Sequence, residues 1–498
     1  MSLESNTPGL VPHPKKGVAL NDNYLSFTGG AGAGDSDTFA QQYLPELYEA
    51  EVERYGNRTI GGFLRMVGAE MPMTSDQVVW SEQNRLHVSY DNCTFQSGGA
   101  YTTNTLRVQL TATDDNMAIK VGNTVVIQGE EGELVARINA ITDNTTPANS
   151  FDLEAEPYEY ANLDALYNTG QDLTVFVFGS EYKKGSDTSG ANAISTITPN
   201  FTQYDNKPII IRDQFTVNGS DAAQIGWVEV ATEDGTSGYL WYMKAESETR
   251  LRFEDYLEMT MVESVKKDGG TSLPADITGS EGLFAAIKDR GNLMDNFAGA
   301  SGGIGGLADF DEILKQLDKE GAIEENMLFL NRSLALEIDD MLGQVNGATQ
   351  GTNTVGASFG LFDNESEMAL NLGFSGFRRG SYDFYKTDWK YLNDAATRGV
   401  AGLNFTPAEM ADADLVEGVL VPAGTSTVYD QILGQNIRRP FLHVRYRASE
   451  TDDRRMKSWV TGSVGGAFTS GLDAMEVHFL SERCLCVQGA NNFVLFRS

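Results

Sequence analysis

Residues 239–267, YLWYMKAESETRLRFEDYLEMTMVESVKK, carry apolar side chains at roughly helical spacing and contain no Pro or Gly. This pattern predicts one continuous helix, which would be about 40 Å long at a rise of about 1.5 Å per residue. Such a helix is about two to three times as long as the average helix of a globular protein. Its apolar stripe is narrow, and charged residues occupy much of the remaining surface. The core of the chain would therefore cover only part of the surface of this helix.

The segments before this helix differ clearly in their residue patterns. Residues 1–38 are rich in Gly, Pro, Ser and Asn and predict an extended arm. Residues 39–75 contain a predicted helix that ends near Gly56 and a connector, and the apolar face of that helix consists of Leu44, Leu47, Tyr48, Val52 and Tyr55. Residues 100–185 hold short runs of β-forming residues separated by Gly, Asn and Asp turns, which predict a small barrel or sandwich.

Extended chain flanks this predicted β domain on both sides. Residues 76–99 and 186–218 contain β-forming residues, and Gly- and Ser-containing joints connect them to residues 100–185. Flexible joints at neighbouring points are typical of an inserted domain. We therefore interpret 76–99 and 186–218 as the two legs of one long loop that carries the β domain.

The remainder of the chain predicts an α+β fold. Within 219–268, residues 220–235 predict a short helix with Ser220 or Asp221 as its N-cap, and the long helix follows. Residues 269–498 alternate between short helices, each followed by Gly, and buried strands such as ENMLFLN and LVEGVLVPAG. This order favours a body of mixed α/β structure after the long helix.

Composition excludes several classes of protein. The 498 residues carry a formal net charge of −33, which repels phosphate backbones and disfavours sequence-specific nucleic-acid binding. No stretch approaches 18 consecutive apolar residues, so no membrane span is expected. Met1 to Gly17 contain no apolar h-region, which predicts no secretory signal. Three cysteines cannot form a disulfide framework, so we expect a protein made in a reducing cytoplasm.

Catalytic and metal-binding patterns are missing from the sequence. None of His13, His87, His443 and His478 lies within ligand spacing of another or beside a cysteine, so no metal site is expected. Cys484 and Cys486 form C-x-C in a predicted strand, and buried thiols are the simpler interpretation of this pair. The glycine runs fit neither the dinucleotide nor the P-loop pattern, and no G-x-S-x-G occurs. The sequence therefore predicts no catalytic residues and no cofactor.

The order of arm, long two-legged loop, long helix and mixed α/β body resembles the major capsid protein of tailed bacteriophages. Particular phrases are similar to the major capsid proteins of crAss-like phages: YLPELYEAEVERYGNRTIGGFL, NFTQYDNKPIIIRDQF, ESETRLRFEDYLE, YDFYKTDWKYLND and SERCLCVQGANNFVLF. The likeness covers nearly the whole chain, and its weight comes from the number and order of these phrases.

This resemblance implies the Hong Kong 97-like capsid fold with an inserted small β-barrel or sandwich domain. Residues 219–268 would supply the spine helix region of the peripheral domain. Residues 269–498 would form the axial domain and the returning strands of the peripheral domain. The neighbours' loops and arms would then cover the part of the long helix that its own core leaves exposed.

The function implied by the resemblance is self-assembly into the icosahedral head shell that encloses the double-stranded DNA of a tailed phage. The partners would be further copies of the chain in hexamers and pentamers, together with portal, scaffolding and head-auxiliary proteins. The shell would assemble in the host bacterial cytoplasm, end as the virion capsid, and require no membrane. An acidic wall would enclose the DNA without sequence-specific binding.

One basic stretch stands out in this acidic chain, at residues 437–459. Arg438, Arg439, Arg454 and Arg455 are candidates for contacts with the acidic surface of a neighbouring subunit, because Arg suits bidentate contacts with carboxylates. The candidate partners lie in the acidic segment 46–54 and are Glu46, Glu49 and Glu53. The alternative is pairing within the subunit, with Glu450, Asp452 and Asp453.

Other functions fit the sequence less well. An encapsulin-type shell would share the fold, but those proteins are usually much shorter. Another structural protein of the phage virion, such as a portal or tail component, is a further alternative, although a portal would need a long helical stem. An acidic glycoside hydrolase would be expected to carry aromatic-rich strand ends beside carboxylates, whereas the five tryptophans are scattered along this chain.

Overall fold

The computed structural model describes residues 62–67, 69–83, 89–110, 117–144, 149–185, 201–220, 229–231, 237–297, 304–347, 375–400, 415–430, 435–464 and 469–497, apart from single positions within these ranges. The chain divides into two compact units. The barrel unit consists of Trp80–Tyr204, and the main unit consists of Met1–Val79 and Asp205–Ser498.

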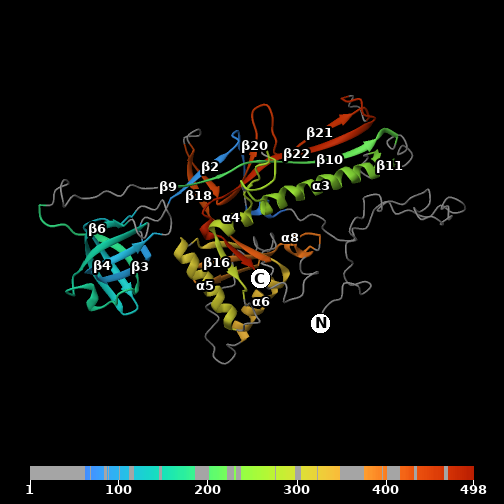
Figure 1. Cartoon of the computed structure of the whole chain (residues 1–498). Coiled ribbons are helices and arrows are strands. Elements are labelled where there is room, and N and C mark those ends of the chain that lie inside the picture. Colours follow the sequence, from blue (N-terminus) through green and yellow to red (C-terminus); the bar gives the residue numbers. More distant parts are fainter. Residues whose placement is uncertain are drawn as a thin grey trace. The chain divides into compact units, whose positions relative to one another are not determined.

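The barrel unit is built around a closed antiparallel barrel of six strands, drawn in blue and cyan in Figure 1. Its strand order is β3-β4-β7-β6-β5-β8. The strands are β3 (Ser89–Gly98), β4 (Tyr101–Gln109), β5 (Asn123–Gly129), β6 (Gly132–Asn144), β7 (Ser150–Pro157) and β8 (Asp172–Ser180), and a short 3₁₀ helix η2 (Leu163–Ala165) lies between β7 and β8. Alternate side chains such as Leu106, Val108, Ile127 and Leu153 point inward and are fully buried.

The boundary expected between the first loop leg and the β domain is wrong. Residues 89–98 were assigned to the leg 76–99, but they form β3, which pairs with both β4 and β8. Cys93 and Phe95 are fully buried in the barrel core, and closure of the barrel needs this strand. The first leg therefore retains β2 (Val78–Gln83), which pairs with β9 (Phe201–Asn206) from the second leg in a two-stranded ladder.

The second leg also ends earlier than expected. Ile209–Asn218 form β10, which runs antiparallel to β22 (Ala474–Val487) over all ten residues of β10. These two strands belong to a five-stranded sheet of order β1-β20-β22-β10, in which β21 (Lys457–Gly462) also pairs with β22. The other two strands are β1 (Glu70–Met73) and β20 (Leu442–Arg447), and these two pair in parallel.

The turn into this sheet depends on Asn206, which is completely buried. Its amide Nδ2 donates to the carbonyl oxygens of Leu485, at 2.7 Å, and of Glu281, at 2.9 Å. Its Oδ1 accepts a hydrogen bond from the Glu281 N–H at 2.8 Å. This side chain therefore joins the end of β9 to β22 and to the segment before α4 (Leu283–Arg290).

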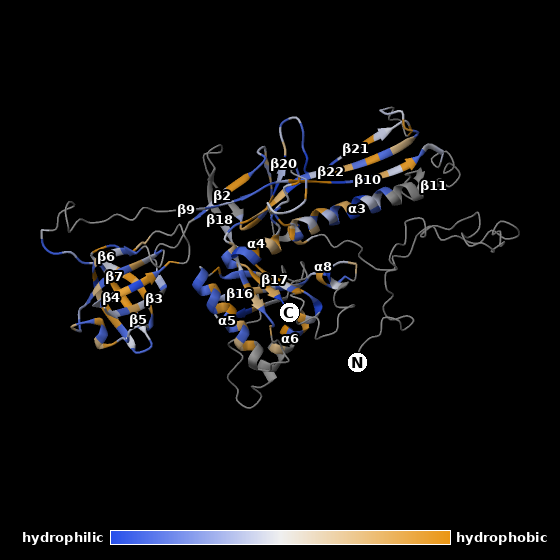
Figure 2. Cartoon of the chain, viewed as in Figure 1, coloured by the Kyte–Doolittle hydropathy of each residue, from blue (hydrophilic) through white to orange (hydrophobic). Residues whose placement is uncertain are grey.

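The long helix is α3 (Leu240–Glu263), 24 residues in length. Figure 1 shows it running alongside β10, β22 and β21. Phe253 and Leu257 on α3 pack against Val477 and Phe479 of β22 in a common core. In Figure 2 hydrophobic and hydrophilic positions alternate along the helix, as expected for an element that has one apolar side.

Two helices predicted near α3 end earlier than the sequence suggested. The helix ends at Glu263 and does not continue to 267, because the backbone beyond it pairs with 278–282: the Lys267 N–H donates to Thr278 O at 2.9 Å, and the Gly282 N–H donates to Ser264 O at 2.8 Å. Residues 220–235 were expected to be a helix, and the chain is helical at 219–220, but Glu229–Ala231 form β11, paired antiparallel with β12 (Ser237–Tyr239); residues 221–228 and 232–235 lie outside the described residues. The alternating WVEV sequence favours a strand there.

The rest of the main unit is a six-stranded mixed sheet with helices, of order β13-β23-β17-β14-β16-β15. Its strands are β13 (Asn292–Asp295), β14 (Glu325–Leu330), β15 (Ser375–Arg379), β16 (Tyr382–Asp388), β17 (Val416–Pro422) and β23 (Val494–Arg497). The other elements are α1 (Phe63–Val67), α5 (Ile304–Glu320), α6 (Arg332–Gly347), α8 (Lys390–Asn393), the 3₁₀ helices η4 (Arg398–Val400) and η5 (Ala490–Asn492), and the hairpin of β18 (Thr425–Asp430) and β19 (Gln435–Pro440).

Two hydrophobic cores hold this part together. One core joins the end of α3 to both sheets through Met261, Phe329, Val419 and Leu485. The other packs α5 and α6 against the six-stranded sheet through Phe310, Ile338, Phe384 and other residues. The described residues therefore form an α+β fold, and the end of α3 is part of the hydrophobic core that the two sheets share.

Candidate functional site

The four candidate arginines lie in two different elements. Arg438 and Arg439 belong to β19, and their backbone pairs with Thr427 and Ser426 of β18. Their side chains lie outside the described residues, and so do all of Glu46, Glu49 and Glu53. Arg454 and Arg455 lie in the connection between β20 and β21, beside the start of β1.

Arg454 pairs with Glu482 on β22. Its Nη1 donates to Glu482 Oε2 at 2.6 Å, and Arg447 Nε lies 2.7 Å from Glu482 Oε1. Only 8% of the Glu482 side chain is exposed, so two guanidinium groups neutralise a carboxylate that is almost completely buried. The expected partner Asp452 is a weaker contact, at 3.4 Å from Arg454 Nε.

Arg455 pairs with Glu70 on β1, and Arg483 on β22 reaches the same carboxylate at 3.3 Å. Only 7% of the Arg483 side chain is exposed. Its Nη2 donates to Arg455 O at 2.7 Å, and its Nε donates to Ser481 Oγ at 2.8 Å. Burial lowers the pKa of Arg483, and the charge of Arg455 lowers it further, while Glu70 opposes both effects.

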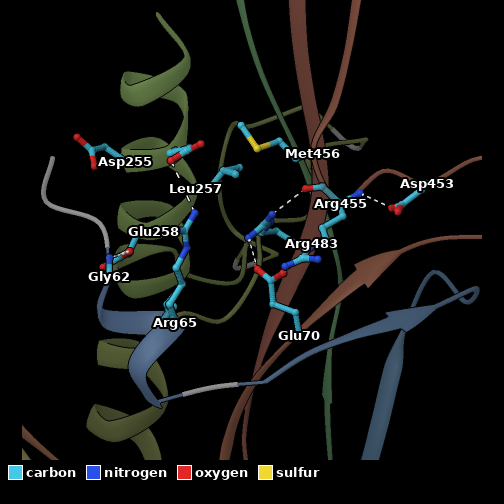
Figure 3. A pocket seen from close by; sticks show the side chains of 12 residues that line it. Gly62, Arg65, Glu70, Asp255, Leu257, Glu258, Asp453, Arg455, Met456 and Arg483 are labelled. Atoms are coloured by element: carbon cyan, nitrogen blue, oxygen red, sulfur yellow. Dashed lines mark hydrogen bonds and ion pairs between the residues drawn. The ribbon is translucent and has the colours of Figure 1, made fainter. Parts of the chain in front are cut away.

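These residues line one side of a pocket of about 440 Å³ between the β1–β22 region and α3. Figure 3 shows Arg455 and Arg483 directed toward Glu70 on that side, with Glu258 reaching Gly62 on the opposite side. The lining residues are Gly62, Leu64, Arg65, Glu70, Glu254, Asp255, Leu257, Glu258, Asp453, Arg455, Met456 and Arg483.

The α3 side of the pocket is acidic, and its carboxylates have partners. Glu258 accepts hydrogen bonds from the backbone N–H groups of Gly62, at 2.7 Å, and Phe63, at 2.9 Å. Burial raises the pKa of Glu258 above its ordinary value, although these two hydrogen bonds act in the opposite direction. Glu254 lies 3.7 Å from Arg65 and 3.4 Å from Arg250.

Most of the side chains that line this pocket are charged. Among its described lining residues there is no His, Cys, Ser or Tyr that could act as a nucleophile or proton carrier near neutral pH. Elsewhere in the described residues, no group of three metal-ligating side chains comes together. Cys484 and Cys486 are buried in β22, as expected for core thiols, and Cys93 is buried in the barrel.

Sequence reasoning missed the acidic partners of the arginines. Glu70 and Glu482 both lie outside the basic stretch 437–459, whereas the sequence suggested Glu450, Asp452 and Asp453. The missing information is the pairing of β1 and β22 with β20, which brings Glu70 and Glu482 beside the β20–β21 connection. The alternating residues of SERCLC could have indicated that Glu482 lies in a strand. The partners of Glu482 could not be predicted, because they depend on strand register.

Comparisons with known proteins give distant structural similarities only. No model of a known protein family matches the chain, and no curated protein matches it. A structure from Microbacterium phage Oxtober96 is 10% identical, with a TM-score of 0.36 over 92% of this chain and 95% of that chain. The mature capsid of bacteriophage PhiM1 is 9% identical, with a TM-score of 0.32 over 64% and 78%.

The capsid structure of cyanophage P-SCSP1u is similarly distant, at 9% identity and a TM-score of 0.31 over 64% of this chain and 80% of that chain. At these identities and TM-scores, none of these structures assigns the chain to a family. In the part of the chain that the structure describes, no helix has the length and apolarity needed to cross a membrane.

Proposed function

We propose that the chain is the major capsid protein of a tailed bacteriophage and self-assembles into the icosahedral shell that encloses the double-stranded DNA genome. The fold would be Hong Kong 97-like, with α3 as the spine helix, the β2–β9 ladder in the extended loop, and the barrel as its inserted domain. The sequence resemblance to crAss-like phages supports the phage assignment.

The observation that carries this proposal is that α3 is buried on one side and exposed on others. Its buried residues Phe253, Leu257 and Met261 face the sheet and the core. On other sides Arg250 and Arg252 are exposed, and 41% of Tyr256 is exposed. Ile210 on β10 and Val460 on β21 are also exposed, at 57% and 41%. A long helix and a sheet with apolar side chains open to solvent are suited to contacts with further copies.

The partners under this proposal are further copies in hexamers and pentamers, with portal, scaffolding and head-auxiliary proteins. The chain would be assembled in the host bacterial cytoplasm and would act in the virion capsid, without enzymatic activity. The net charge of −33 would reduce binding of the enclosed duplex to the shell, so the DNA would be held by confinement.

Electron microscopy of the purified protein and of the cells that produce it tests this function. We expect closed shells of uniform size, and sedimentation should separate them from free subunits. Shells filled with DNA in infected cells would favour the phage capsid over an encapsulin-type compartment. A folded protein that stays monomeric in solution, and that forms no shells in cells producing the phage, would rule out both.

A further inference from the structure

We propose that Asn206 is a positioning residue for the extended loop, because it fixes the point at which the second leg of this loop joins the main unit. The legs are β2 and β9, which pair with each other and connect the main unit to the barrel unit along the chain. We call the contacts of Asn206 with Ser280, Glu281 and Leu485 the Asn206 anchor. This inference rests on the proposed function in one respect, since the position of the loop matters for assembly only if the loop meets further copies.

The first argument is that the completely buried side chain of Asn206 uses all of its hydrogen-bonding groups. Its Nδ2 donates to Leu485 O at 2.7 Å and to Glu281 O at 2.9 Å. Its Oδ1 accepts from the N–H groups of Glu281, at 2.8 Å, and Lys207, at 2.9 Å, and from Ser280 Oγ at 3.2 Å. The side chain is held in one orientation, because the reverse orientation would turn its oxygen toward two carbonyl oxygens.

The second argument is that the partners of Asn206 are themselves held in place. The side chain of Glu281 pairs with Arg290 of α4 at 2.9 Å, and both side chains are largely buried. Leu485 is a buried residue of β22, which pairs with β20 and β10 on either side. The chain after Asn206 is also stiff, because the ring of Pro208 restricts the backbone at the entry to β10. Asn206 therefore ties the end of β9 to fixed elements of the main unit.

The third argument is that the two legs leave the main unit side by side. The chain passes between the two units after Val79 and after Tyr204. Next to these points, Gln77 Nε2 donates to Asp205 Oδ2 at 3.0 Å. This contact is exposed and competes with water, whereas the contacts of Asn206 are buried. The base of the loop therefore depends more on the Asn206 anchor than on the contact between the legs.

A small movement at this base would be enlarged along the loop. β2 and β9 are each six residues long. At about 3.3 Å per residue each leg measures about 20 Å, so a rotation of about 10° at the base would move its far end by about 3 Å. Such a shift separates side chains that pack at about 4 Å. A loop that meets the same surface on every further copy therefore needs a fixed base.

Hydrogen exchange of the unassembled full-length subunit, followed by mass spectrometry, tests the Asn206 anchor. Asn206→Ala removes an acceptor from the N–H groups of Lys207 and Glu281, so peptides that contain them should exchange about tenfold faster or more. Asn206→Asp keeps the size of the side chain but turns an oxygen toward the carbonyls of Leu485 and Glu281, so it should protect these peptides no better than Ala. Wild-type exchange in both variants, or faster exchange throughout the main unit, overturns the proposal.

Asn292→Ala is the matched control for assembly. Asn292 Nδ2 also donates to backbone carbonyls, of Asn491 at 2.6 Å and Phe493 at 3.4 Å, but it lies on β13 and not at the base of the loop. Both variants are compared at a temperature at which thermal unfolding shows each subunit to be folded. Asn206→Ala should reduce the yield of sedimenting shells by about tenfold or more, and Asn292→Ala by less than about twofold. Equal losses, or a full yield from Asn206→Ala, overturn the positioning role.

Ser280→Ala is the milder variant if Asn206→Ala gives no folded subunit. It removes one of the three hydrogen bonds to Asn206 Oδ1, so it should accelerate exchange of the same peptides by a smaller factor. Unchanged exchange in Ser280→Ala then overturns the Asn206 anchor. If the wild-type chain forms no shells while Asn206→Ala still accelerates the local exchange, the anchor is supported and the proposed shell function is contradicted.

Discussion

Glu258 on α3 accepts a hydrogen bond from the backbone N–H of Phe63 at 2.9 Å, across 195 positions of sequence. Through this carboxylate the first described residues of the main unit are attached to the long helix. The ring of Phe63 then packs between those of Trp389, at 4.4 Å, and Phe329, at 4.5 Å. The start of α1 is therefore held by polar and apolar contacts together.

We expect Glu258→Ala to lower the free energy of unfolding by about 1–3 kcal/mol, because two backbone N–H groups lose their acceptor. Glu258→Gln keeps one oxygen acceptor and should lose less. Chemical denaturation of the unassembled subunit measures both values, and equal losses for the two variants would contradict a role for the acceptor.

The raised pKa of Glu258 also predicts a pH dependence. Because burial disfavours the ionised form, the native state gains stability as pH falls and loses it as pH rises through the raised pKa. The Gln variant should lack this part of the dependence. This is measured by the melting temperatures of wild type and Glu258→Gln across the acidic pH range. If the two plots of melting temperature against pH run parallel, Glu258 does not contribute to the pH dependence.

Arg398 and Glu263 should show the opposite dependence at the end of α3. Arg398 Nη2 donates to Glu263 Oε2 at 2.7 Å, and Tyr391 also donates to this carboxylate. Burial alone would raise the pKa of Glu263, but these hydrogen bonds and the charge of Arg398 lower it. The pair therefore contributes stability above the ordinary Glu pKa and loses it as pH falls through the lowered value.

Arg398→Met should accordingly destabilise the subunit by about 1–3 kcal/mol at neutral pH. The difference from wild type should shrink on acidification below the usual carboxyl range. Denaturation at a series of pH values tests this, and a difference that stays constant would indicate that packing of Arg398 against Phe284 is responsible.

The continuity of α3 is tested at Phe253, which is completely buried. Phe253→Pro should disrupt the helix at a cost of about 3 kcal/mol or more, beyond the loss of the ring, and should abolish shell assembly. Phe253→Ala is the control, since it removes the ring and keeps the helix. Normal shells from the Pro variant, seen by electron microscopy, would exclude α3 as a spine of the assembly.

The barrel should fold alone, because the buried residues described in its core all lie within residues 93–175. We expect a fragment of residues 88–183 to show β-type circular dichroism and cooperative thermal unfolding. Ile127→Asp in the same fragment should abolish the transition, because it buries a charge in the barrel core. A fragment without a cooperative transition would show that the barrel depends on the main unit.

Gly462 lies at a close approach in the five-stranded sheet. Its φ is +128°, and a Cβ there would overlap the carbonyl oxygen of Ala474. Gly462→Ala should therefore cost about 1–3 kcal/mol, whereas Gly471→Ala, where the Cβ meets open space, should change stability by less than about 0.5 kcal/mol. Equal melting temperatures for the two variants would contradict this strain.

The sequence alone determined the elements that depend on local periodicity. Apolar spacing identified the long helix, although its end at Glu263 was missed. Alternating β-formers with polar turns identified a barrel or sandwich after residue 100, but not its first strand, Ser89–Gly98. These features can be predicted from sequence because the side chains that form the buried face of a helix or strand lie only a few residues apart.

Only the tertiary structure decided which charged residues meet. The pairs Arg454–Glu482 and Phe63–Glu258 join positions 28 and 195 residues apart. The first depends on the register of β20 and β22, and the second depends on where α1 lies against α3. A carboxylate can satisfy a guanidinium or an N–H group from any part of the chain, so its partner is chosen by the packing of the apolar faces, which no local stretch of sequence contains.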